Sequence, residues 1–173
     1  MAKQTKIDDF EAVFDQYKGW VYKTAYLITQ NHYKAEDVMQ EVFINAYRSN
    51  GTYNPKKGNL SSWLRRITIN QCLKDKRDKS PSTYSIEEME EQGHSIPDEN
   101  LPLSEQVTLK NDIRRLLSSL NQKSRAVLIL RYYDGLAYSE IAELLNIPLG
   151  TVKSRINTAI STLQTKQGQA GKD

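Results

Sequence analysis

Several features that mark other classes of protein are scarce in this chain of 173 residues. Cys72 is its one cysteine, so no disulfide can form within the chain, which suits a reducing cytoplasm. No apolar run reaches the roughly eighteen residues of a transmembrane helix, and the N-terminal residues lack the apolar core of a signal peptide. We therefore expect a cytoplasmic protein that does not insert into membranes.

Residues that would carry catalysis or bind a metal do not cluster either. The two histidines, His32 and His94, are far apart, and neither has ligand partners at metal-binding spacing. Gly150 and Thr151 lack the rest of a phosphate-binding loop. We therefore expect no catalytic residues, no metal site and no cofactor, and we interpret the chain as something other than an enzyme.

Glycine and proline are also few, at 8 and 5 residues, and apolar residues recur at helical rather than strand spacing. These features predict an all-α protein. The net charge of +3 hides an uneven distribution, because residues 78–105 are acidic and the segments on both sides are basic. Basic segments are typical of proteins that contact phosphate backbones, although many solvated helices share the feature.

The strongest motif lies in residues 134–165 and predicts two short helices joined by a tight turn. Ser139 is a suitable N-cap for the first helix and Asn146 a suitable left-handed C-cap, and Pro148 cannot continue that helix. The second helix begins near Thr151, and its outer face bears polar side chains that can bond phosphates and base edges. The pattern predicts a DNA-binding helix-turn-helix; a helical hairpin with a solvated polar face is the alternative.

Two helices are predicted in the first fifty residues. The first spans about 8–29, and Gly19 is expected to bend or divide it. The second spans about 34–48, and one of its faces is acidic within a basic segment, with Asp37, Gln40, Glu41 and Ile44. That face is either simply solvated or a docking surface for a basic partner.

A loop and a third helix follow. Residues 50–59 are rich in turn formers, and a helix is predicted from Leu60 to about Lys79. The outward face of this helix holds cations and amides, which suit single-stranded nucleic acid when combined with Tyr53 in the loop. We expect Trp63 to belong to the core rather than to stack on a base.

The chain divides at residues 80–103, a segment with three prolines and a run of glutamates. After it, helices are predicted from Ser104 to Asn121 and from Lys123 to Tyr133. We therefore predict two small helical domains joined by an acidic flexible linker. The first domain is residues 1–79, the second is residues 104–166 and contains the helix-turn-helix, and 167–173 form a tail.

Together these segments resemble bacterial RNA polymerase sigma factors of the extracytoplasmic-function group, which keeps only two sigma domains. The likeness is carried by AEDVMQEVFINAYR (35–48), YNPKKGNLSSWLRRITIN (53–70), DKRDK (75–79) and LILRYYDGLAYSEIAELLNIPLGTVKSRI (128–156). It covers nearly the whole chain outside the linker and the extreme ends. The resemblance implies a sigma-two-like domain in 1–79, a sigma-four-like domain in 104–166 and no obligate homo-oligomer.

The resemblance also implies partners and the residues that bind them. The helix at 35–48 would dock on the β′ clamp helices of core RNA polymerase, the β subunit being a further contact, through Asp37, Gln40, Glu41 and Phe43. The following loop and helix would capture a flipped base and hold the melted strand of the minus-ten promoter element, through Tyr53, Asn54, Lys56, Lys57, Asn59, Arg65, Arg66, Asn70, Lys74 and Arg77. The second helix of the helix-turn-helix would read the minus-thirty-five element, through Thr151, Lys153, Ser154, Arg155, Asn157 and Thr158. An anti-sigma factor is a further implied partner.

One stretch departs from the family pattern. Members often carry arginines along the later part of this last helix, whereas here it reads INTAISTL (156–163). We expect fewer phosphate contacts, weaker DNA binding and a shallower dependence of binding on salt.

The expected function is therefore that of a sigma factor, which binds core RNA polymerase, recognises promoter DNA and helps to melt it. A stand-alone helix-turn-helix regulator, which would bind operator duplex without polymerase, is the alternative from another class. Residues 1–79 resemble neither a dimerisation helix nor a ligand domain, as such a regulator would need. A third possibility is an adaptor that binds polymerase but not DNA, and the basic faces at 65–79 and 151–155 argue against it.

Overall fold

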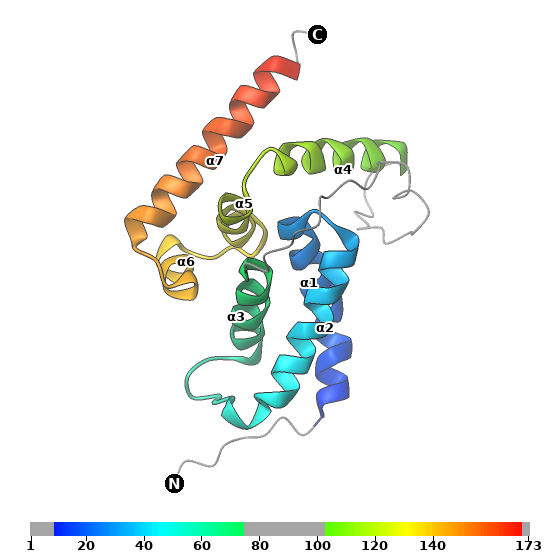
Figure 1. Cartoon of the computed structure of the whole chain (residues 1–173), viewed down its shortest axis with the longest axis vertical. Coiled ribbons are helices and arrows are strands. Elements are labelled where there is room, and N and C mark those ends of the chain that lie inside the picture. The colour runs from blue at the N-terminus through cyan, green and yellow to red at the C-terminus, as the bar shows by residue number, and fades with distance from the viewer. Residues whose placement is uncertain (1–8, 75–102, 171–173) are drawn as a thin grey trace.

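A computed structural model describes residues 9–74 and 103–170, and the side chains of 9–74 and 111–168. In these ranges the chain is helical without any strand, as the sequence predicts. Helices α1 (Phe10–Thr29), α2 (His32–Arg48) and α3 (Leu60–Leu73) form one group in Figure 1, and α4 (Leu103–Ser118), α5 (Gln122–Leu128), α6 (Tyr138–Leu145) and α7 (Leu149–Ala170) form a second. Apart from Leu103, the linker predicted at 80–103 lies outside the described residues. A search of the described helices finds none with the length and apolar character of a membrane span.

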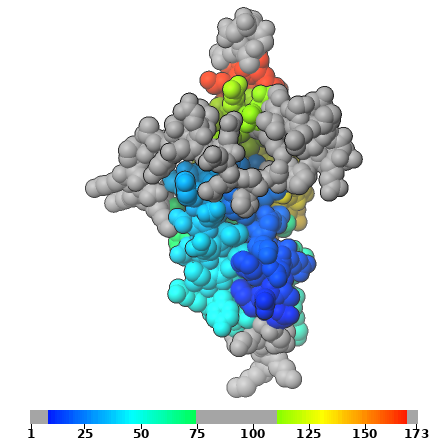
Figure 2. Space-filling model, turned by 90° about the vertical axis from the view of Figure 1, so that its right-hand side faces the viewer, coloured from blue at the N-terminus to red at the C-terminus, as the bar shows by residue number. Residues whose placement is uncertain are grey.

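The first three helices pack around apolar stripes. Val21 of α1 meets Val42 and Phe43 of α2 in one cluster, and Val13, Ala46 and Leu64 form another. The Phe14 and Phe43 rings meet edge to face with their centroids 4.8 Å apart, a favourable geometry for aromatic pairs. Figure 2 shows the face on which α1 and α2 lie side by side, in blue and cyan.

The prediction that Gly19 bends or divides the first helix is wrong. Helix α1 is continuous from Phe10 to Thr29. Gly19 lies on its exposed side, next to Trp20 and Val21, which pack against the apolar cluster that α1 shares with α2. A glycine costs a helix about 1 kcal/mol relative to alanine, and the burial of the neighbouring side chains outweighs that cost.

Asparagine caps set the starts of α2 and α3. The Asn31 side-chain oxygen accepts the backbone N–H of Lys34 at 2.9 Å, so α2 begins at His32 rather than at 34. The Asn59 oxygen likewise accepts the N–H of Ser62 at 2.8 Å. Such caps satisfy backbone donors that have no partner inside the helix and contribute about 1 kcal/mol each. Helix α3 ends at Leu73, and the predicted continuation to Lys79 lies outside the described residues beyond Lys74.

The helix-turn-helix is formed by α6 and α7, with one cap different from the prediction. Ser139 is not the N-cap; α6 begins at Tyr138, and the Glu140 carboxylate accepts the backbone N–H of Ala137 at 2.6 Å. The predicted left-handed cap at Asn146 is confirmed by its φ of 52°. The carbonyl of Pro148 accepts N–H groups of the first turn of α7, which therefore starts slightly before Thr151.

The helix predicted from Lys123 to Tyr133 has two parts. Helix α5 covers Gln122–Leu128, and Ile129–Tyr133 continues as a π-helical turn. Gly135, with a φ of 71°, then reverses the chain into α6 in a conformation that side-chain-bearing residues rarely adopt.

Candidate functional site

The acidic face predicted on α2 is at the surface. Asp37 and Gln40 are exposed, Glu41 is half-buried, and Ile44, one turn further along the helix, is 43% exposed. Phe43, which the resemblance implied as a polymerase contact, is only 6% exposed and packs against Phe14. Phe43 therefore positions α2 on α1, and the surface itself is formed by the other residues.

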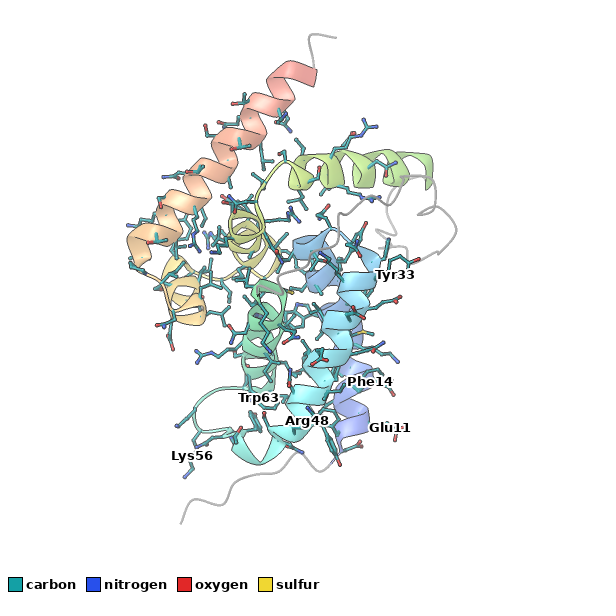
Figure 3. All side chains as sticks on the ribbon, in the orientation of Figure 1. Glu11, Phe14, Tyr33, Arg48, Lys56 and Trp63 are labelled. Carbon is teal, nitrogen blue, oxygen red and sulfur yellow. The ribbon has the colours of Figure 1, made fainter. Side chains whose placement is uncertain are left out.

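Two aromatic side chains extend this face, although the sequence did not predict them as part of it. Tyr33 and Tyr47 are 64% and 65% exposed, near opposite ends of α2. Figure 3 labels Tyr33 and Arg48 on the same helix. Tyr47 follows Ile44 and Gln40 at helical spacing, so the i, i+4, i+7 pattern was the signal that could have included it. The face thus combines carboxylates with exposed apolar surface.

The loop between α2 and α3 is shaped by its own asparagines. The Asn54 side-chain oxygen accepts the backbone N–H of Lys56 at 2.9 Å, and Asn59 caps α3. Lys56 and Lys57 are exposed, and Lys56 extends from the outer end of the loop in Figure 3. The two asparagines thus hold the loop in a form that presents two cations.

Tyr53 and Trp63 form an aromatic wall where this loop meets α3. Their ring centroids are 5.4 Å apart, and both side chains are half-buried. Trp63 packs against the cluster of Val13, Ala46 and Leu64, as expected of a core residue. The pair leaves part of an aromatic surface beside the exposed lysines, which is the chemistry that binds unstacked bases.

Helix α3 splits the remaining candidates for the minus-ten strand into two sets. Arg66, Asn70 and Lys74 are exposed and recur every four residues, so they line one stripe. The Arg65 side chain is only 19% exposed, and its Nε lies 3.3 Å from the Asp134 carboxylate. Arg77 lies outside the described residues. Arg66 also lies 3.8 Å from the Glu143 carboxylate, but both side chains are well exposed and such pairs contribute little.

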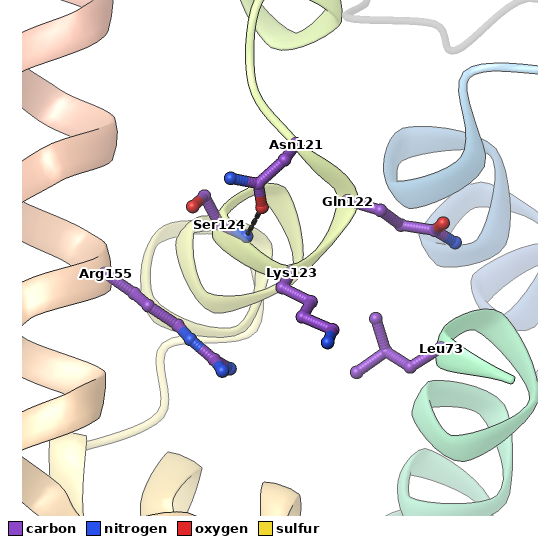
Figure 4. Close-up of a pocket in the computed structure, with 6 residues that line it drawn as sticks. All are labelled: Leu73, Asn121, Gln122, Lys123, Ser124 and Arg155. Atoms are coloured by element: carbon purple, nitrogen blue, oxygen red, sulfur yellow. Dashed lines mark hydrogen bonds between the residues drawn. The ribbon is translucent and has the colours of Figure 1, made fainter. Parts of the chain in front are cut away.

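The candidates on α7 are also divided. Lys153, Ser154, Asn157 and Thr158 are exposed on one face, whereas Thr151 is half-buried. Arg155 turns instead toward a cavity of about 380 Å³ that it lines with Lys123 and Leu73 (Figure 4). This cavity lies between α7, α5 and the end of α3. The face of α7 that is open to DNA is therefore formed by Lys153, Ser154, Asn157 and Thr158.

Cys72, the one cysteine of the chain, is buried. Cys72 is 4% exposed, and burial raises the pKa of its thiol to about 12, which keeps it a poor nucleophile at neutral pH. Among the described residues, no three His, Cys, Asp or Glu side chains gather as a metal would require. The exposed features are an acidic and apolar helix face, a basic and aromatic loop, and a polar face on α7.

Family models match both parts of the chain. The model for Sigma-70 region 2 matches residues 13–81, and the model for Sigma-70, region 4 matches residues 110–163. These ranges contain the α2 face, the loop and α3 in the first case, and the helix-turn-helix in the second.

Curated relatives match across both regions. The chain is 34% identical over 165 residues to the ECF RNA polymerase sigma factor SigW of Bacillus subtilis, an alignment that covers 91% of this chain and 88% of the relative. It is 36% identical over 140 residues to the ECF RNA polymerase sigma-E factor of Escherichia coli K12, covering 75% of this chain and 72% of the relative.

Solved structures share the fold. The sigma factor RpoE of Bartonella quintana, solved with the anti-sigma factor NepR, has a TM-score of 0.67 at 24% identity, covering 92% of this chain and 96% of that one. CnrH, solved with the cytosolic domain of CnrY, has a TM-score of 0.63 at 19% identity, covering 92% and 88%. Matches in both regions and across nearly the whole length of SigW show that this chain belongs to the ECF RNA polymerase sigma factors, which direct transcription initiation.

Proposed function

We propose that the chain performs this function with two modules, residues 1–79 and 104–166, each of which reads one promoter element. Helix α2 in the first module docks the chain on polymerase. The observation that supports the proposal is the contrast between two helices of the first module. Helix α2 exposes carboxylates and apolar side chains, whereas α3 and its loop expose cations, amides and aromatic rings. One surface suits a basic protein partner and the other suits nucleic acid, so both can be bound at once.

The partner proposed for α2 is core RNA polymerase, at the clamp helices of its β′ subunit, with a further contact to the β subunit. Asp37, Gln40 and Glu41 supply charge and hydrogen-bonding groups, and Ile44 supplies an apolar contact one turn after them on the same face. A mixed surface of this kind is typical of specific protein interfaces, whose central contacts are apolar and whose rim is polar.

The loop and α3 are proposed to hold the melted strand of the minus-ten element. Tyr53, supported from behind by the core residue Trp63, is proposed to offer aromatic surface to a flipped base, and Lys56 and Lys57 in the same loop supply charge for phosphates. Extruding a base costs a few kcal/mol, which stacking and charge contacts must offset. Arg66, Asn70 and Lys74 continue this surface along the helix.

The proposed minus-thirty-five reader is the exposed face of α7. Lys153 supplies a cation, and Ser154, Asn157 and Thr158 supply hydrogen-bonding groups of a length that reaches base edges. Asn157, Thr158 and Ser161 are exposed but uncharged, so few phosphates are neutralised and the salt dependence stays shallow. Two surfaces that each bind DNA weakly reach a higher combined affinity for the promoter when one chain links them on polymerase.

The chain itself is proposed to have no enzymatic activity and to act in the cytoplasm beside polymerase. An anti-sigma factor is a proposed further partner, because the structurally similar RpoE was solved with the anti-sigma factor NepR. Whether this chain has such a partner is tested by recovering tagged protein from resting cells. A bound protein other than polymerase subunits is expected.

Charge reversal on α2 tests the docking surface. Asp37→Lys with Glu41→Lys should abolish most binding to purified core polymerase, because two attractive contacts become repulsive. Asp112→Lys, at an exposed site on α4, is the matched control and should bind normally. Normal binding by the double variant would remove the docking assignment.

Substitutions on α7 test the reading surface. Lys153→Ala with Asn157→Ala should leave polymerase binding intact and reduce promoter-specific initiation about tenfold or more, from the loss of two base or phosphate contacts. Lys166→Ala removes the same charge three to four turns later on the same helix and should have little effect. Equal effects of the two variants would exclude the assignment, and a shift of duplex DNA without polymerase would favour the stand-alone regulator.

A further inference from the structure

The two modules of this sigma factor share one buried junction. Ile28 and Ile69 of the first module and Val127 and Leu130 of the second belong to a single apolar cluster, and all four are fully buried. Figure 1 shows α3 beside α5 and α6. Cys72, 4% exposed, belongs to the same cluster at the end of α3.

Polar groups of α5 complete the ends of two helices of the first module. The buried Arg125 donates to the carbonyls of Leu117 and Leu120 in its own module and, at 2.5 Å, to the carbonyl of Ile28 in α1. The Gln122 side chain donates to the carbonyl of Cys72 in α3 at 2.6 Å. Ile28 and Cys72 lie in the last turns of their helices, where carbonyls lack partners within the helix. The second module supplies those partners.

A third contact involves Arg65, a residue for which the family resemblance implies contact with the minus-ten strand. Asp134, whose side chain is 2% exposed, lies with one carboxylate oxygen 3.3 Å from Arg65 Nε. Its other oxygen accepts the Trp20 indole N–H at 3.1 Å, and the Arg65 guanidinium lies 5.6 Å from the centre of the Trp20 ring. The Asp134 carboxylate thus supplies to Arg65 the negative charge that a phosphate would otherwise supply.

We propose that the contacts of Asp134 with Trp20 and Arg65 latch the two modules in a closed state, which withholds Arg65 from the minus-ten strand until the modules part. The closed state itself depends on contacts within the chain. Only the consequence for DNA rests on the function proposed above. A chain that must open before binding has its apparent affinity lowered by the fraction that is open.

Cys72 provides a reporter of this opening that needs neither polymerase nor DNA. It is the one cysteine of the chain and lies in the junction cluster. Its reaction with an aromatic disulfide reagent measures how often the junction opens, because the buried thiol is poorly reactive while closed. The full-length protein is used, with helical content followed by circular dichroism.

Three variants and a control separate the latch from general stability. Asp134→Arg places two like charges together and should speed the Cys72 reaction by about tenfold or more. Trp20→Phe keeps an aromatic ring beside Arg65 and removes the N–H donor together with the five-membered ring that carries it, for an increase of about threefold. Arg65→Asp combined with Asp134→Arg restores opposite charges and should return the rate toward that of the original protein. Asp112→Arg, on the exposed side of α4, should leave the rate unchanged.

The proposal is overturned if Trp20→Phe, with its helical content intact, does not speed the Cys72 reaction, whether or not Asp134→Arg folds. It is also overturned if the charge swap reacts as fast as Asp134→Arg alone. The consequence for DNA is read separately: with core polymerase and promoter, Trp20→Phe should reach half-maximal initiation at about one third of the protein concentration. An unchanged concentration would overturn the withholding of Arg65, and failure of every form to initiate would refute the proposed function while leaving the Cys72 results valid.

Discussion

At the scale of single residues, burial changes the acidity of Cys72. The pKa of its thiol rises from 9.0 to about 12 because the charged thiolate loses its hydration in the apolar junction. A raised pKa in the folded state means that the stabilisation is complete below the ordinary pKa and is lost as pH rises toward the folded value. The affected window therefore lies above about pH 9.

This shift predicts an alkaline loss of stability that depends on Cys72. Between pH 8 and pH 10 the free energy of unfolding should fall by about 1.4 kcal/mol more in the original protein than in Cys72→Ala. Urea unfolding of both proteins at the two pH values measures the difference. Tyrosines and lysines that titrate in the same range act on both proteins, so parallel losses would contradict the burial of this thiol.

Substitution of the buried Arg125 should cost stability at the junction of the two modules. Arg125→Met preserves length and apolar contact but leaves the carbonyls of Ile28 and Leu120 without the guanidinium donor, whereas the Leu117 carbonyl still accepts the backbone N–H of Leu120. Each unsatisfied buried acceptor costs about 1 kcal/mol or more, so a loss of about 2 kcal/mol is expected. Urea unfolding measures it, with Arg115→Met on the exposed side of α4 as the control. A loss below about 1 kcal/mol would show that water replaces the guanidinium.

The sequence indicates which residues are candidates for binding more readily than it indicates where their side chains point. The stripe of Arg66, Asn70 and Lys74 follows from spacing alone. Spacing also suggested that Arg65 and Arg155 face outward, because charged side chains usually do. The structure turns Arg65 to Asp134 and Arg155 into a cavity, and the partners come from segments distant in the sequence.

At the scale of the helices, α1 contains a position where stability can be gained. Gly19 is exposed and helical, and a β-carbon placed there would have no atom within 4 Å. Gly19→Ala should raise the free energy of unfolding by about 0.5–1 kcal/mol, because alanine loses less conformational freedom on entering a helix. Thermal and urea unfolding test this. A neutral or destabilising result would indicate that α1 needs local freedom at this turn.

Helix ends were predictable where one side chain dictates them. Asn146 takes the left-handed conformation expected of a C-cap, and Pro148 ends the turn before α7. The start of α6 was missed because Ser139 has the right chemistry for a cap, but the Glu140 carboxylate reaches back to Ala137 and sets the boundary two residues earlier. Competing caps within a few residues have similar energies, so the sequence could not rank them.

At the scale of the whole molecule, the sequence predicted two modules but not their junction. Apolar periodicity identifies which side chains of each helix are buried, without saying which helix covers them. The Trp20–Asp134 hydrogen bond joins positions 114 residues apart, and no local pattern encodes such a pair. The same limit applies to Phe43. The family motif predicts that it contacts polymerase, but in the structure it is buried against Phe14 of α1.

The two modules are proposed to act together, so that one chain on polymerase addresses two promoter elements. The most direct measurement is transcription by purified core polymerase on fragmented genomic DNA, with and without this protein, followed by mapping of transcript starts. New starts are expected to be preceded by two shared motifs at a fixed spacing, since α3 and α7 are proposed to read separate elements. Binding to polymerase without new starts, or starts that share only one motif, would contradict this proposal.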